Sequence, residues 1–465
     1  MKITLVFPRL TDNYDILGGS NWVVRSSIRA FGLGQTSFTP PLSLLMLAAV
    51  TPPGVEVKIL DERLEDIDFD EETDLVGISV VTRAAPRAYL IASEYHKRGI
   101  KVVLGGIHPS ALPKEALQHA DALVIGEGES VWPELIGNFQ QGELKTIYKG
   151  IPLLDLDLLP WPRREIIRSP ELYASTKVVT ATRGCPNSCT FCSAGVGLVK
   201  KYRKRSVKNI IAELESLPGK MVIFMDDNIG WDQAYTKELF SAMAPLGLHW
   251  MGAITASALE DSELVKLAAK SGCFMFGVGF ESLSPQVIKS VRKQRTNHPE
   301  CYASLIKRCQ DAGIAVWGNF ILGFDDDTLD TFSELIEFIN RTRIELVSIF
   351  PLIPYPGSVL FRQYEKQNRI LTKDWRFYDP ADGACIYTPE QLTREQLLNG
   401  YLRVIEDIYA YRKALLRLLR SHSRFSFAMV VALHYYLQSK RSIPDQRLRV
   451  ADSIKLSSNW DSTGQ

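Results

Sequence analysis

Three cysteines stand close together in the segment Arg183-Gly-Cys-Pro-Asn-Ser-Cys-Thr-Phe-Cys192, where Cys185, Cys189 and Cys192 have the spacing C-x-x-x-C-x-x-C. Thiolates this close in the chain can share one metal centre. Structural zinc is an alternative, but it takes four ligands, and no second Cys or His pair follows at the usual spacing. Most electron-carrier iron–sulfur clusters have four cysteine ligands. Three thiolates therefore favour a cubane cluster that leaves one iron open to a substrate.

The other four of the seven cysteines are scattered along the chain, at Cys273, Cys301, Cys309 and Cys385. An odd number spread this thinly does not form a disulfide framework. Single cysteines behave as small core hydrophobes. One tight cluster and four scattered thiols indicate a reducing, cytoplasmic compartment.

Composition indicates a globular protein with several domains. The chain has 465 residues, of which 46% are hydrophobic, and its net charge is +1. Such a neutral balance gives no general attraction to nucleic acid. The apolar run after Met1-Lys2 is typical of a strand rather than a secretory signal. No apolar stretch reaches the ~18 residues of a membrane-spanning helix.

The cysteine motif follows the first strand of a predicted partial (β/α)6 barrel over 171–365. Six apolar segments alternate with helical ones, and the site of such a barrel lies at the carboxyl ends of its strands. The predicted barrel strands are 177–182, 221–225, 249–254, 274–280, 315–322 and 346–351. Polar or small residues at their ends are Asp226, Asp227, Gly277, Gly279, Glu281, Ser282 and Gly323. Each of these is equally explained by helix capping or a tight turn.

A second alternating series precedes the barrel over residues 1–141 and predicts a doubly wound parallel sheet. Its strands are predicted at 3–7, 55–60, 75–81, 101–104 and 122–125. Ligands bind such sheets beyond the carboxyl ends of the strands. The residues near those ends are Ser79, Thr82, Gly105, Gly106, His108, Gly126, Glu127 and Glu129. A proline-rich linker is expected at 142–170, and a mainly helical region at 366–465.

The cysteine spacing, with Phe191 just before the last cysteine, resembles the signature of the radical S-adenosylmethionine (SAM) enzymes. The resemblance implies that the open iron binds SAM, and that reductive cleavage yields a 5′-deoxyadenosyl radical. It also implies a reducing partner such as flavodoxin or ferredoxin. The residues it assigns to SAM binding are Phe191, Asp226, Asp227, Gly277, Gly279, Glu281, Ser282 and Gly323.

The first domain is similar to the flavodoxin-like cobalamin-binding domain that precedes the barrel in one large subgroup of these enzymes. Its matching features are Pro40-Pro41, the Ser79 and Thr82 strand end, Gly105-Gly-Ile-His-Pro109 and Gly126-Glu-Gly-Glu129. The resemblance spans residues 1–420 and implies cobalamin at these strand ends. The Asp-x-His-x-x-Gly cobalt-ligand motif is absent. His108 is then a candidate ligand or a loop hydrogen-bonding residue, and a sheet without any cofactor is the alternative.

A basic, acid-free segment lies near the end of the chain, at 408–444. Its cations flank the apolar run Phe425–Leu437, which predicts a helix at a membrane surface through 412–441 or one packed on the barrel. The cations are Arg412, Lys413, Arg417, Arg420, Arg424, Lys440 and Arg441. The surface helix would place the protein at the inner membrane face and favours an apolar substrate such as a lipid, terpenoid or tetrapyrrole.

Together these features predict a cobalamin-dependent radical SAM enzyme that methylates an unactivated carbon of an apolar metabolite. One alternative is a radical cyclase, rearrangement or oxidation catalyst without methyl transfer. An iron–sulfur or cobalamin sensor without turnover is the alternative of another class. No nucleic-acid partner is expected.

Overall fold

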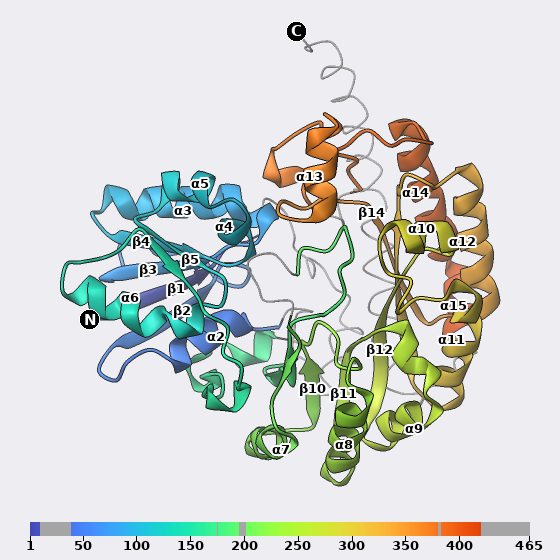
Figure 1. Cartoon of the computed structure of the whole chain (residues 1–465). Helices are drawn as coiled ribbons and strands as arrows, with labels where there is room; N and C mark the ends of the chain where they lie inside the picture. Colours follow the sequence, from blue (N-terminus) through green and yellow to red (C-terminus); the bar gives the residue numbers. More distant parts are fainter. Residues whose placement is uncertain (10–38, 174, 195–200, 380–382, 420–465) are drawn as a thin grey trace.

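Two parallel β-sheets, each covered by helices, lie next to each other in the computed structural model (Figure 1). The structure describes residues 1–9, 39–173, 175–194, 201–379 and 383–419. The amino-terminal sheet is the blue half of Figure 1, and the carboxy-terminal sheet curves through the green, yellow and orange half.

The first sheet has six parallel strands in the order β2-β1-β3-β4-β5-β6. Helix α3 packs on one face, and helices α2 and α6 pack on the other. The strands are β1 (Lys2–Phe7), β2 (Glu56–Asp61), β3 (Leu75–Ser79), β4 (Lys101–Gly105), β5 (Ala122–Ile125) and β6 (Ile147–Lys149). The helices are α2 (Leu42–Ala49), α3 (Ala85–Lys97), α4 (Ile107–Ala111), α5 (Pro113–Ala116) and α6 (Trp132–Gln140). Apolar residues on both sides of each central strand explain this doubly covered arrangement.

The sequence predicts five of these strands and places the sixth, β6, inside the linker. β6 pairs with β5 along the sheet edge, so the sheet extends past the boundary expected at residue 141. Its side chains Ile147 and Lys149 are exposed and only Tyr148 is buried. Three residues with this pattern carry too little alternation to be recognised as a strand.

The second sheet has six parallel strands in the order β14-β13-β12-β11-β10-β7, which confirms the predicted partial barrel. Its strands are β7 (Val178–Val179), β10 (Met221–Phe224), β11 (His249–Ile254), β12 (Cys273–Glu281), β13 (Ala315–Leu322) and β14 (Leu346–Pro351). The helices around it are α7 (Val207–Ser216), α8 (Gln233–Met243), α9 (Ser262–Lys270), α10 (Pro285–Ser290), α11 (Tyr302–Asp311), α12 (Leu329–Thr342) and α13 (Val359–Lys366). In Figure 1 α8, α9, α11 and α12 line the convex side of this sheet.

The first barrel strand is shorter than predicted. Instead of one strand over 177–182, the chain forms β7 and then a separate β8 (Thr182–Arg183). β8 pairs antiparallel with β9 (Arg203–Lys204), and Arg183 lies opposite Arg203. The cysteine segment therefore leaves from a small two-stranded ribbon rather than from the barrel sheet.

The carboxy-terminal region joins both halves. Helix α14 (Arg394–Ile408) packs on α12, where the absence of a side chain at Gly400 makes room for the Phe332 ring. Trp375 and Tyr378 pack instead into the core on the α3 side of the first sheet. Helix α15 (Tyr411–Leu419) ends the described chain. No helix in the described ranges has the length and apolar character needed to cross a bilayer.

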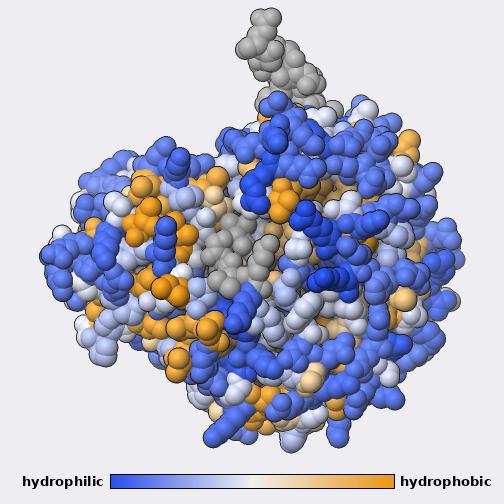
Figure 2. Space-filling model, viewed as in Figure 1, coloured by the Kyte–Doolittle hydropathy of each residue, from blue (hydrophilic) through white to orange (hydrophobic). Residues whose placement is uncertain are grey.

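Hydrophobic side chains also reach the surface. Figure 2 shows them gathered on the first-domain half, toward its junction with the barrel. Ile151, Leu154 and Leu158, from the segment that joins the two halves, are among the exposed ones.

The basic segment near the end of the chain is described only in part. Arg412 is exposed, Lys413 pairs with Asp407, and Arg417 is buried with its guanidinium donating to the Ile408 carbonyl. Arg417 therefore adds nothing to a basic surface, contrary to the expectation. Phe425–Leu437 and the remaining cations lie outside the described residues.

Candidate functional site

A cavity of about 350 Å³ lies between the carboxyl ends of the first-sheet strands and the mouth of the barrel. The first-domain wall includes six of the eight strand-end residues singled out from the sequence, namely Ser79, Gly105, Gly106, Gly126, Glu127 and Glu129. The opposite wall comes from the barrel and includes Thr180, Thr182, Arg183, Gly184, Met225 and Asp227. The structure thus brings six of the eight predicted cobalamin-binding residues to the same space as the start of the cysteine motif.

Glycines shape the first-domain wall of this cavity. Gly106 has φ +104°, and a Cβ there would lie 2.9 Å from the backbone N and O of Val80, so only glycine fits without strain. Gly105 has no such conflict, because a Cβ would meet only Val124 Cβ at 3.6 Å. The wall between strand ends is therefore bare backbone with apolar side chains beside it, and it can accept a large flat ring such as a corrin.

Thr82 and His108 lie outside the cavity wall. His108 is fully buried, with its Nε2 3.0 Å from Tyr89 Oη and 3.3 Å from Glu115 Oε1, and the Trp375 ring meets it edge-on at 5.4 Å. Trp375 Nε1 in turn donates to Glu115 at 2.7 Å. These contacts agree with the hydrogen-bonding alternative for His108 and not with a cobalt ligand at the cavity.

The cysteine loop is anchored to the barrel by backbone hydrogen bonds. The Thr190 amide donates to the Val291 carbonyl at 3.1 Å, and the Thr190 carbonyl accepts from the Leu360 amide at 2.8 Å. Phe191 packs on the barrel core, with its ring 5.9 Å from that of Phe324 in an edge-to-face arrangement. The loop therefore sits against the carboxyl end of α10 and the first turn of α13.

The electrostatics of the three thiols fit a metal cluster. Burial raises the pKa of Cys185, Cys189 and Cys192, that of Cys189 to about 11. Neighbouring thiolates raise the pKa of Cys189 and Cys192 further, and the Asp227 carboxylate raises that of Cys185. Three thiolates at one place are thus unfavourable without a bound cation. Within the described ranges no three His, Cys, Asp or Glu side chains converge on one ion.

Asp226 and Asp227 have different surroundings although they are adjacent. Asp226 is buried and accepts hydrogen bonds from the Ala181 amide at 3.1 Å, the Thr182 amide at 2.5 Å and the Thr182 hydroxyl at 2.6 Å. Burial raises its pKa to about 6. Asp227 faces the cavity, and burial raises its pKa too, against a hydrogen bond from the Gly184 backbone. Asp226 thus fixes the backbone before the motif, while Asp227 lines the cavity where a ligand can reach it.

We expect Asp226→Ala to lower the free energy of unfolding by about 2–4 kcal/mol, because it leaves three buried donors without an acceptor. Asp226→Asn keeps one side-chain oxygen as an acceptor and should lower the free energy of unfolding clearly less. Urea unfolding of the two variants checks both values. An alanine variant as stable as the parent protein would contradict this structural role.

The end of β12 is held by a lysine that the sequence patterns did not single out. Glu281 has a positive φ of 66° and pairs with the buried Lys293, whose ammonium also donates to the Gly279 carbonyl at 2.9 Å. A Cβ at Gly279 would lie 2.4 Å from Glu281 Oε1, so a larger residue there would displace the Glu281 carboxylate. Lys293 also lowers the pKa of Cys189. A lysine in a loop carries no signal of burial, so only the fold reveals this positive charge beside the thiols.

The remaining predicted positions have local roles in the structure. Gly323 has φ +106°, its carbonyl accepts from the Tyr387 hydroxyl, and its amide donates to the buried Asp327 at 2.8 Å. The Ser282 hydroxyl accepts from the Ser284 amide at 3.1 Å at the start of α10. Gly277 leaves open space, since nothing lies closer than 3.9 Å to a Cβ placed there.

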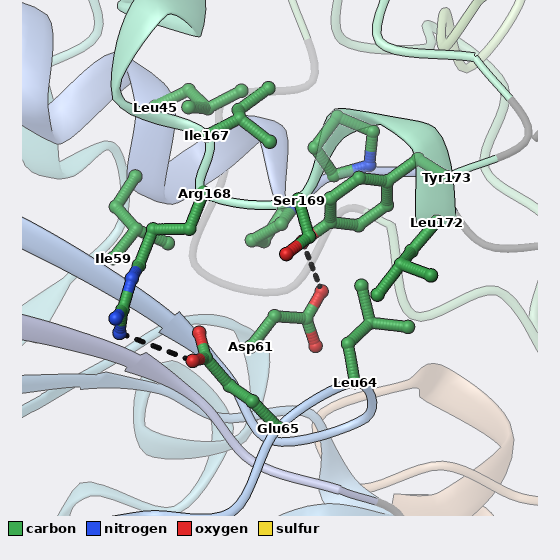
Figure 3. A pocket seen from close by; sticks show the side chains of 12 residues that line it. Leu45, Ile59, Asp61, Leu64, Glu65, Ile167, Arg168, Ser169, Leu172 and Tyr173 are labelled. Atoms are coloured by element: carbon green, nitrogen blue, oxygen red, sulfur yellow. Dashed lines mark hydrogen bonds and ion pairs between the residues drawn. The ribbon is translucent and has the colours of Figure 1, made fainter.

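A second, much smaller cavity of about 30 Å³ separates α2 from the segment 167–173 (Figure 3). Tyr173 donates a hydrogen bond to Asp61 Oδ2 at 3.0 Å across it, and Arg168 pairs with Glu65 at 3.2 Å. This space holds no more than a water molecule or two. It marks where the segment between the two halves is fastened to the first domain.

Two domain families match the chain where the two halves of the site lie. Residues 35–136 match the B12 binding domain, and residues 179–339 match the Radical SAM superfamily. Among solved structures, the chain resembles a radical S-adenosylmethionine methyltransferase from Kitasatospora setae with cobalamin and a 4Fe–4S cluster bound, with a TM-score of 0.60 and 18% identity over 79% of this chain and 78% of that one. It also resembles the cobalamin-dependent enzyme OxsB with aqua-cobalamin bound, with a TM-score of 0.62 and 15% identity over 98% and 79% of the two chains.

Two curated relatives are more similar in sequence. The bacteriochlorophyllide d C-12(1)-methyltransferase of Chlorobaculum tepidum is 34% identical over 381 residues, which cover 79% of this chain and 82% of that protein. The C-8(2)-methyltransferase of the same organism is 30% identical over 398 residues, 81% and 87% of the two chains. The chain therefore belongs to the radical SAM enzymes that carry a cobalamin-binding domain, and its cofactors are a 4Fe–4S cluster, SAM and cobalamin.

Proposed function

We propose that the enzyme methylates an unactivated carbon of an apolar tetrapyrrole. The observation that carries the proposal is the cavity that both halves line, with Gly105 and Gly126 on one wall and Gly184, the neighbour of Cys185, on the other. A methyl donor and a radical source must act on the same carbon, so they must share one space. The two relatives named for methylation of bacteriochlorophyllide d support both the reaction and the substrate class.

The residues of the chain have distinct tasks in this reaction. When bound, the cluster with SAM supplies the radical that removes a hydrogen atom, and cobalamin supplies the methyl group. Cys185, Cys189 and Cys192 hold the cluster. The strand ends at Ser79, Gly105, Gly106 and Gly126 hold the corrin.

Apolar surface on the barrel side of the cavity supports an apolar substrate. Met225 lines the cavity and is 51% exposed, beside the carboxylate of Asp227. A large exposed hydrophobic side chain at the mouth of a site favours contact with an apolar ring or chain. Asp227 supplies one polar contact at this place, as binding sites commonly combine an apolar lining with a few polar groups.

Labelled methyl transfer tests the proposal. Anaerobically reconstituted protein is supplied with cobalamin, a low-potential reductant, bacteriochlorophyllide d and SAM that carries a CD₃ methyl group. We expect a pigment that has gained one CD₃ group, together with 5′-deoxyadenosine. Formation of 5′-deoxyadenosine with an altered but unlabelled pigment would instead show the cyclase, rearrangement or oxidation alternative. Absence of 5′-deoxyadenosine under every condition would instead support the alternative of a sensor without turnover.

The partners follow from the same chemistry. A radical SAM reaction consumes an electron from outside the protein, so a small reductant of the flavodoxin or ferredoxin type is the natural donor. Contact with a membrane surface through 412–441 would bring an apolar substrate to the site. Only Arg412 and Lys413 of its cations are both described and at least partly accessible. Flotation with anionic vesicles at low salt tests this contact, and a protein that stays in the soluble fraction would exclude it.

A further inference from the structure

Four charged side chains join the two halves of the enzyme at the base of the cysteine loop. Arg183 donates to Glu129 Oε1 at 2.7 Å and lies 3.6 Å from Glu127 Oε2, while Arg203 donates to Glu127 Oε2 at 2.9 Å. Both glutamates lie in the loop after β5, and both arginines lie in the β8–β9 ribbon. We call the four residues Glu127, Glu129, Arg183 and Arg203 the interdomain clasp.

The clasp holds both ends of the chain segment that carries the cysteines. Arg183 and Arg203 are register partners in β8 and β9, so Cys185, Cys189 and Cys192 all lie in the stretch between them. Arg183 is separated from Cys185 by Gly184 alone. A shift of either guanidinium would therefore change the direction in which the chain enters or leaves the cluster loop.

The clasp is buried and its partners are fixed. The side chains of Arg203, Glu127, Glu129 and Arg183 are 2%, 9%, 12% and 19% exposed. Arg203 also donates to the Leu153 carbonyl at 3.0 Å. The Glu127 backbone packs so closely on Gly150 that a Cβ there would lie 2.0 Å from the Glu127 carbonyl oxygen. Two positive and two negative charges compensate each other, and removal of one would leave a buried charge without its partner.

All four clasp residues also line the large cavity. We propose that the interdomain clasp couples the two cofactor sites. When cobalamin fills the first-domain end of the cavity, the clasp holds the cysteine loop in the position that binds SAM, so that cobalamin and SAM bind cooperatively. The loop after β5 lines the cavity with Gly126 and Gly128, where it would support the ring, and its two glutamates hold the arginines. A ligand that orders this loop therefore orders the base of the cysteine loop as well, and the effect is reciprocal. This inference rests on the cofactor sites of the proposed function and makes Arg183 and Arg203 positioning residues.

The test compares SAM affinity with and without cobalamin in anaerobically reconstituted protein. The readout is the change that SAM causes in the electron paramagnetic resonance spectrum of the reduced cluster, titrated in the presence and absence of hydroxocobalamin. We expect cobalamin to tighten SAM binding at least about fivefold in the parent protein. Glu129→Gln should abolish this difference and keep the iron content. The charge-swapped double variant Arg183→Glu with Glu129→Arg should restore part of the difference in SAM affinity.

A matched control separates positioning from general loosening of the domains. Asp379→Asn breaks the ion pair of Asp379 with Arg83, which also joins the first domain to the carboxy-terminal half and is similarly buried. This variant should keep the cooperativity. Equal cooperativity in Glu129→Gln and the parent, no cooperativity in the parent, or its loss in Asp379→Asn would overturn the proposal. Because the readout is SAM binding, absence of methyl transfer to the pigment would count against the proposed function and not against the clasp.

Discussion

Alanine at Cys185, Cys189 and Cys192 together should remove the iron–sulfur absorbance at about 400 nm and reduce bound iron from about four atoms per chain to almost none. These three thiols are the proposed cluster ligands, and alanine removes all of them at once. Cleavage of SAM should fall by more than the ~100-fold that loss of an outer-shell partner costs at a metal site. Iron analysis, absorbance and 5′-deoxyadenosine formation after anaerobic reconstitution measure these effects.

Cys301→Ala is the matched control for this triple variant. Cys301 is half-buried like Cys185 and Cys189 but lies in the single 3₁₀ turn before α11, outside the cysteine motif. It should keep the iron content and SAM cleavage of the parent protein. A triple variant that still binds about four irons and cleaves SAM would contradict the assignment, and so would stoichiometric zinc in strictly anaerobic preparations of the parent.

Local sequence patterns are sufficient to predict the two sheets because their central strands are uninterrupted apolar runs that alternate with amphipathic helices. Local patterns fail to predict strands whose limits depend on contacts with residues far away in the sequence. The expected strand over 177–182 is divided because Asp226, 44 positions beyond Thr182, accepts the Thr182 and Ala181 amides. β6 is held by its pairing with β5 and by the burial of Tyr148, and its three residues are too few to show a strand pattern. Both failures arise from partners that lie far away in the sequence.

The cysteine motif can be recognised in the sequence because its three proposed ligands lie within one short segment. The other site residues depend on how the chain turns after each strand. Gly105 and His108 are three positions apart, yet Gly105 lines the cavity and His108 enters α4, where Tyr89 and Glu115 surround it. Position near a strand end alone does not distinguish a residue that lines the cavity from one that is buried in the following helix.

Local sequence is equally unable to show which charged side chains are already paired in the fold. Glu127 and Glu129 were expected to contact cobalamin, and they do line the cavity, but their carboxylates pair with Arg203 and Arg183. Arg203 lies 76 positions from Glu127. Nothing in the local sequence distinguishes a carboxylate that meets a ligand from one that compensates an arginine of another domain. Only the fold shows that these charges are already paired.

Gly105→Leu should weaken cobalamin binding about tenfold to a hundredfold while the protein stays folded. Gly105 ends β4 on the cavity wall, has no positive φ, and would place a Cβ no closer than 3.6 Å to Val124. The backbone therefore accepts leucine, and the new side chain occupies the space that the ring needs. Overpacking a fitted space costs about 1–3 kcal/mol, which corresponds to this range. Absorbance titration with hydroxocobalamin measures the affinity, and urea unfolding verifies the fold.

The neighbouring Gly106 is less suited to this test, because its φ of +104° and its approach to Val80 would strain any larger residue and disturb the fold itself. Gly137→Leu is the matched control. Gly137 lies in α6, is similarly half-exposed, and has nothing within 4 Å of a Cβ, so leucine there should leave cobalamin affinity unchanged. Unchanged affinity in a folded Gly105→Leu protein would exclude the β4 end as the corrin site. An equal loss of cobalamin affinity in Gly137→Leu would show that the weaker binding of Gly105→Leu does not come from a filled cavity.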